Sequence, residues 1–181
     1  MHTLIAFIRG INVSGHNIIK MEDLRAIFSD LGLKNIKTYL QSGNVVFDYE
    51  SNDVKALTNI ISDAISNKIG SKIELIILQT QQLKNMIDAN PFVNAINFES
   101  NQMYLTFLSS NAKLENFELL LSNKKIEEQI ILINNVIYIF CPEGYGKSKL
   151  TNNLIESKLK TIATTRNWKT VNEVLKIAIG K

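Results

Sequence analysis

The chain has 181 residues, 45% hydrophobic and 20% charged, which is the composition of a globular protein with a substantial core. Its net charge is only +3, and its apolar runs fall far short of the roughly 18 to 20 residues needed to cross a bilayer. The single cysteine, Cys141, excludes an internal disulfide and a cysteine-rich zinc site. We therefore expect a cytoplasmic protein with no role in the membrane.

The first 79 residues predict the β-α-β-β-α-β order of a ferredoxin-like unit. A continuous apolar run at residues 4–8 indicates a buried central strand. Apolar residues recur at helical spacing over 21–31 and 54–69, and Asp53 is placed to cap the second of these helices. The other expected elements are strands at 36–40, 45–49 and 73–78 and a tight turn at 41–44.

Residues 80–181 repeat this order incompletely, because no fourth strand is evident. The last helix is expected from about Thr170 to Ile179, with Thr170 and Glu173 at the spacing of a capping box. The other expected elements are a linking helix at about 81–89, a strand at 103–107, a helix at 114–121, a hairpin of 130–133 and 136–140, and a helix starting near Ser148.

These patterns predict an α+β protein of two ferredoxin-like (βαββαβ-type) halves packed together, the second lacking its last strand. Residues 1–79 would form the first subdomain. Residues 80–181 would supply a linking helix and the second subdomain, with basic C-terminal helices. Two prolines in the whole chain leave no room for a Pro-rich linker between the halves.

Basic charge is concentrated near the end of the chain. Residues 142–181 contain eight Lys or Arg against three Asp or Glu, whereas residues 1–79 are neutral overall. This asymmetry indicates an anionic partner, with a solvated basic helix face as the alternative.

The segment at residues 142–150 lies between an expected strand and an expected helix. It is not a P-loop, because Cys141 stands where that motif requires glycine. Two glycines can still turn backbone N–H groups inward, a following helix offers free donors, and Lys147 and Lys149 add charge. An anion site and a tight turn with solvated lysines are both consistent with this pattern.

Two further segments carry candidate binding residues. Arg166 can bind a phosphate or carboxylate through two parallel hydrogen bonds. Trp168 can stack on a base or cover the core. Arg9 ends an apolar strand, where a charge requires a ligand or a salt-bridge partner.

Metal and nucleophilic chemistry find little support. The two histidines, His2 and His16, have no metal-ligand spacing. Cys141 ends an apolar strand, as a buried structural cysteine does, and would need His16 as its base. Glu143 is the obvious acid or base only if the fold brings it to the basic loops. No metal and no cofactor are expected.

Taken together, these segments resemble a known family, domain of unknown function 1697. The resemblance spans nearly the whole chain; Ser14-Gly15 stands where the family has a glycine pair. It implies a compact bacterial protein with two ferredoxin-like halves and supplies no activity. It rests on residues 6–13 (AFIRGINV), 19–21 (IKM), 38–47 (TYLQSGNVVF), 142–152 (PEGYGKSKLTN) and 163–168 (ATTRNW).

We therefore predict binding of an anionic, phosphate-bearing ligand, nucleotide-like or nucleic acid, at one basic site. A metal-independent enzyme on a small phosphorylated or carboxylated substrate, and a structural or interaction protein without ligand, are the alternatives. The predicted site residues are Arg9, Asn12, Lys20, Ser42, Asn44, Gly144, Tyr145, Gly146, Lys147, Ser148, Lys149, Arg166, Asn167 and Trp168.

Overall fold

The computed structural model describes residues 1–51, 53–93 and 99–180. The chain divides into two compact units, one of Met1–Asn85 with Glu173–Lys181 and one of Met86–Asn172. The predicted boundary between the subdomains falls after residue 79, whereas the first unit continues to Asn85. The last nine residues of the chain, predicted in the second subdomain, belong to the first unit.

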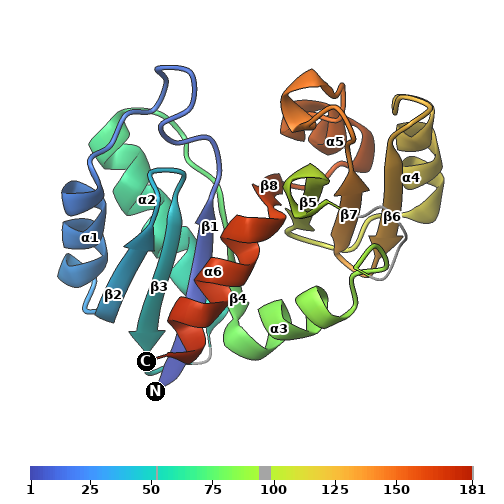
Figure 1. The fold of residues 1–181 in the computed structure, drawn as a ribbon. Coiled ribbons are helices and arrows are strands. Elements are labelled where there is room, and N and C mark those ends of the chain that lie inside the picture. The colour runs from blue at the N-terminus through green and yellow to red at the C-terminus, as the bar shows by residue number, and fades with distance from the viewer. Residues whose placement is uncertain (52, 94–98, 181) are drawn as a thin grey trace. The chain divides into compact units, whose positions relative to one another are not determined.

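The first unit contains a four-stranded antiparallel sheet in the order β2-β3-β1-β4 (Figure 1). Helices α1 and α2 pack on one face, where Phe28 and Ile61 meet Leu4 and Phe47 of the central strands. Its elements are β1 (His2–Ile8), α1 (Met21–Asp30), β2 (Lys34–Tyr39), β3 (Asn44–Tyr49), α2 (Val54–Ile69) and β4 (Leu75–Gln79).

Local signals define the ends of α2 but not the start of α1. The Asp53 side chain accepts a hydrogen bond from the Ala56 N–H, and Gly70 ends α2 in the left-handed conformation at φ +79°. At α1, Lys20 occupies the N-cap position without a side-chain hydrogen bond to the helix.

The second unit contains a second four-stranded antiparallel sheet, in the corresponding order β6-β7-β5-β8 (Figure 1). Phe117 of α4 and Ile155 of α5 pack with Leu108 and Ile139. Its elements are β5 (Met103–Leu108), α4 (Leu114–Leu121), β6 (Gln129–Ile133), β7 (Val136–Phe140), α5 (Asn152–Leu159) and β8 (Ala163–Asn167), with one-turn 3₁₀ segments at Ser100–Gln102 and Tyr145–Lys147. Helices α3 (Thr80–Asp88) and α6 (Trp168–Ile179) have residues in both units.

The two halves confirm the α+β, two-unit ferredoxin-like fold, but the missing fourth strand of the second half was a wrong prediction. Strand β8 pairs antiparallel with β5, with Thr165 opposite Thr106. Its sequence, ATTRN, contains one apolar residue, so hydrophobic alternation does not reveal it. Backbone pairing to β5 and a 2.7 Å hydrogen bond between the Thr106 and Thr165 hydroxyls hold it in place.

Two helix starts also differ from prediction. The helix expected near Ser148 begins only at Asn152, where the Thr151 hydroxyl accepts from the Leu154 N–H. The last helix begins at Trp168, because Asn167 Oδ1 accepts from the Thr170 N–H at 2.7 Å. Thr170 is therefore in the first turn, and the capping box of Thr170 and Glu173 is wrong. No helix in the described ranges has both the length and the apolar character to span a membrane.

Candidate functional site

The predicted site residues fall into two local groups. One group lies in the first unit, and the other lies in the second. A single pocket that joins both groups stays a prediction. The first group is Arg9, Asn12, Lys20, Ser42 and Asn44; the second is Gly144, Tyr145, Gly146, Lys147, Ser148, Lys149, Arg166, Asn167 and Trp168.

Asn12 fastens the loop between β1 and α1. Its Nδ2 donates to the Ile19 carbonyl at 3.0 Å and to the Gln41 carbonyl at 2.9 Å, and its Oδ1 accepts from the Ile19 N–H at 2.9 Å. The residue has φ +54°, a left-handed conformation that asparagine tolerates better than most side chains. The Asn12 amide is thus engaged within the fold, and it positions the start of α1 beside the β2–β3 turn.

The β2–β3 turn is held from inside. The buried Asn44 donates to the Tyr39 carbonyl at 2.9 Å and to Ser42 Oγ at 3.0 Å. A Cβ on Gly43 would lie 2.9 Å from Ile8 Cβ, and the residue has φ +75°, so the turn requires glycine. Ser42 and Asn44 therefore shape the turn that presents Gln41.

Arg9 follows β1 as the first residue of the loop. Its N–H donates to the Glu74 carbonyl at 2.8 Å, and its side chain is half-buried. The backbone bond joins the end of β1 to the segment that precedes β4.

Two cavities are lined within the first unit, and the first of them lies beside these loops. The Lys20 cavity, about 560 Å³, is lined by Asn12, Ile18, Ile19, Lys20, Met21, Glu22, Arg25 and Gln41. The Lys37 cavity, about 570 Å³, is lined by Arg25, Lys37, Thr38, Lys176, Ile177 and Gly180. Arg25 lines both.

The cations of these cavities are mostly without carboxylate partners. Lys20, Arg25 and Lys37 form no ion pair within the described residues. Arg25 Nη1 donates to Thr38 Oγ1 at 2.8 Å, which ties α1 to the edge strand β2. Lys176 differs, since its Nζ lies 2.7 Å from Glu173, and this hydrogen bond raises the pKa of Lys176.

Sequence reasoning identified Asn12 and Lys20 here and missed Arg25, Lys37 and Lys176. Each of the three missed residues lies on a helix or a strand, outside any motif that marks a binding site. The +5 balance of residues 142–181 was a signal for Lys176 alone, while Arg25 and Lys37 lie in a neutral part of the sequence.

The glycine loop of the second unit closes on itself. The Gly144 N–H donates to the Cys141 carbonyl, the Lys147 N–H to Gly144 and the Ser148 N–H to Tyr145, at 2.9 to 3.1 Å. These three backbone N–H groups, which an anion would need as donors, are thus engaged in the turns of the loop itself. The N-terminal N–H groups of α5 do not adjoin the glycines, because the helix begins only at Asn152. Gly146 has an exposed backbone, and the side chains of Lys147 and Lys149 are exposed to solvent.

Tyr145 is a structural anchor of this loop. Its hydroxyl donates to the Leu150 carbonyl at 2.6 Å and lies 3.1 Å from Thr165 Oγ1, and its ring packs against Tyr104 with centroids 5.0 Å apart. Burial raises the pKa of Tyr145 to about 12. The hydroxyl and one face of the ring are therefore engaged within the unit.

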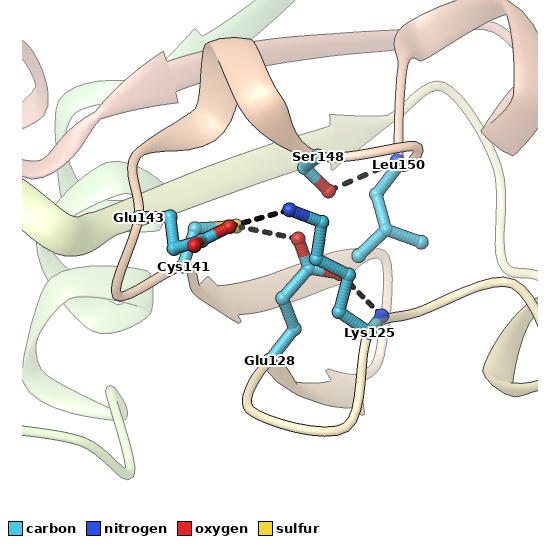
Figure 2. A network of polar contacts seen from close by, with 6 residues as sticks. All are labelled: Lys125, Glu128, Cys141, Glu143, Ser148 and Leu150. Carbon is cyan, nitrogen blue, oxygen red and sulfur yellow. Dashed lines mark hydrogen bonds and ion pairs between the residues drawn. The ribbon is translucent and has the colours of Figure 1, made fainter.

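A polar network lies under the same loop (Figure 2). Glu128 is buried; it accepts the Lys125 N–H at 2.8 Å and lies 3.7 Å from the Cys141 sulfur. Burial, followed by the Glu128 charge, raises the pKa of the Cys141 thiol to about 12. Cys141 is thus a protonated thiol at neutral pH, which is a poor nucleophile.

The Glu143 carboxylate pairs with Lys125 at 2.5 Å (Figure 2). The Lys125 hydrogen bond lowers the pKa of Glu143. Glu143 is therefore ionised at neutral pH and unsuited to the role of a general acid.

Arg166, Asn167 and Trp168 join β8 to α6. Arg166 is buried, and its Nη1 donates to Thr164 Oγ1 at 2.8 Å and to the Thr165 carbonyl at 2.9 Å. Burial lowers the pKa of Arg166 to about 10, so the guanidinium stays charged at neutral pH. Asn167 caps α6, and Trp168 is half-buried in its first turn.

Metal ligands do not gather in the described part of the chain: it holds no group of three or more His, Cys, Asp or Glu residues able to hold an ion.

Comparison with known proteins supports the fold. The family model described as "Protein of unknown function (DUF1697)" matches residues 1–138. The structure is similar to that of the conserved bacterial protein SP0830 from Streptococcus pneumoniae, with a TM-score of 0.70, 19% identity and 98% of each chain covered. A search of the curated proteins finds no match.

Proposed function

The chain belongs to the DUF1697 family of unknown function, and from its geometry we propose that it binds an anionic, phosphate-bearing ligand in the Lys20 cavity. The ligand class is a nucleotide-like molecule or a nucleic acid. We place this activity in the cytoplasm, on the ground that the one thiol, Cys141, is buried and free.

One observation carries the proposal: Lys20 and Arg25 line a cavity without carboxylate partners in the described residues. An ionised phosphate would supply the missing negative charge. Arg25 can offer a planar pair of N–H donors to it, and such charge-assisted bonds are about twice as strong as neutral ones. Glu22 also lines the cavity, so the ligand must approach on the side of the two cations.

The start of α1 brings both donors and opposing charge. The helix has no side-chain cap, and its first-turn N–H groups form the positive end of the helix dipole, but Glu22 and Asp23 lie in the same turn and offset it. Asn12 fixes the Ile19 backbone just before this turn. The loop is thus pre-organised, which reduces the entropy lost on binding.

Titration calorimetry with orthophosphate at low ionic strength tests the proposal. Arg25→Met should weaken binding by about tenfold or more, since a hydrogen bond to a charged group contributes about 1.5 to 3 kcal/mol. Lys34→Met is the matched control. It removes the same charge from neighbouring β2, but Lys34 lines neither cavity and pairs with Glu50 at 3.0 Å. An equal loss of orthophosphate affinity in the two variants would mean that binding depends only on the net charge of the protein, and would contradict a binding site at the Lys20 cavity.

A structural or interaction protein without a ligand is the second candidate. It is favoured by Asn12, Asn44 and Tyr145, whose side chains hydrogen-bond within their own units. Absence of orthophosphate binding to the wild-type protein would favour it. Glu143 is ionised beside Lys125, so we assign it no role as a general acid.

A further inference from the structure

We infer that the ligand carries at least two phosphate groups, one in the Lys20 cavity and the next in the Lys37 cavity, with the Arg25 guanidinium between them. This inference rests on the proposed function and narrows the class of ligand.

Arg25 is the physical link between the two cavities, because it lines both. Its one side-chain hydrogen bond within the described residues runs from Nη1 to Thr38 Oγ1 at 2.8 Å. A guanidinium has five N–H donors in a planar fork. Donors therefore remain for oxygens on either side, and the Thr38 bond holds the guanidinium at the boundary.

The Lys37 cavity has the charge of a second phosphate site. Lys37 is exposed on the edge strand β2 and has no ion pair in the described part of the chain. Lys176 adds a second cation, though Glu173 offsets part of its charge. The cavity lining contains no acidic residue among those described. A single phosphate bound at Lys20 would leave Lys37 unneutralised.

The two cavities, at about 560 and 570 Å³, each have room for a phosphate group. Phosphates linked through shared oxygens, as in a polyphosphate, and phosphates linked through sugars, as in a short single strand of nucleic acid, both present successive anions.

The experiment compares orthophosphate, tripolyphosphate and a four-residue oligothymidylate on the full chain by calorimetry. Wild type should bind tripolyphosphate or the oligonucleotide about tenfold tighter than orthophosphate, the gain expected from one additional charged hydrogen bond. Lys37→Met should remove that gain, because it takes away the cation of the second cavity. Lys34→Met should leave the gain and the orthophosphate affinity at their wild-type values, because Lys34 lines neither cavity.

Each outcome decides one question. A gain that only Lys37→Met removes supports the inference, and the tighter of the two longer probes identifies the source of the phosphates. Equal binding of all three probes, or equal effects of Lys37→Met and Lys34→Met, overturns the inference and leaves the proposed function standing. Failure of orthophosphate to bind overturns the proposed function and the inference with it.

Discussion

The two units share one strand order and differ in how they use their polar residues. In the first unit, Asn12 and Asn44 hold the loops, and the cations Lys20, Arg25 and Lys37 are left without carboxylate partners in the described residues. In the second unit, the glycine loop bonds to itself and Glu143 pairs with Lys125. The two units thus differ in where their cations lie: beside cavities in the first unit, and on or under a loop that bonds to itself in the second.

The larger of two mutational effects on stability should come from Gly43, which packs closely against the side chains of Ile8 and Ile11. Gly43→Ala places a Cβ 2.9 Å from Ile8 Cβ at φ +75°, so we expect a loss of about 3 kcal/mol, from overpacking of about 1 to 3 kcal/mol and left-handed strain of about 1 to 2 kcal/mol. Urea unfolding of the variant and the wild type measures this loss in the free energy of unfolding. Gly70→Ala is the control, because its φ is +79° but its Cβ would meet nothing within 4 Å, and only the strain should remain. Equal losses would show that the close contact at Gly43 relaxes freely.

A smaller loss should follow from Tyr145→Phe in the second unit. The variant keeps the ring packing on Tyr104 and removes the hydroxyl that serves the Leu150 carbonyl, so we expect about 1 to 2 kcal/mol. The same urea unfolding measures this change. Orthophosphate affinity should stay at the wild-type value, because Tyr145 belongs to the unit without the proposed site. Weakened phosphate binding would instead return the ligand to the glycine loop.

Alkali should also lower the stability of the protein, again through groups of the second unit. Burial raises the pKa of Cys141 from 9.0 to about 12, and of Tyr138 and Tyr145 from 10.0 to about 12. A raised folded-state pKa contributes stability that is full below the unfolded pKa and is lost as pH rises through the folded pKa. Stability should therefore fall between about pH 9 and 12.

Cys141→Ala sharpens this test by removing one of the three groups. Its unfolding midpoint should fall less steeply with pH than that of wild type, although it starts lower because a buried side chain is truncated. A slope identical to that of wild type would mean that the thiol titrates alike in the folded and unfolded chains.

Much of the fold follows from local patterns. The apolar run of β1, the helical stripe of α2 and the Asp53 cap of α2 each predict their own element, because periodicity and capping act over a few residues. Strand β8 was not predicted, because its sequence, ATTRN, has no apolar alternation and its strand conformation depends on pairing with β5. The start of α6 was misjudged because Asn167 and Thr170 both suit an N-cap, and the side chain that bonds in the folded chain decides between them.

For the site, the sequence by itself determined the tight turn at residues 41–44, and it predicted Asn12, Ser42 and Asn44 as ligand-binding residues. Their hydrogen bonds within the loops are seen only in the folded chain. The tertiary structure alone decided which charges lie near a cavity. Arg25 and Lys37 come from a helix and an edge strand, and they become neighbours only when α1 packs on β2 and Arg25 bonds to Thr38. The physical reason is that backbone conformation is a local property, whereas the field at a cavity depends on every charge the fold brings near it.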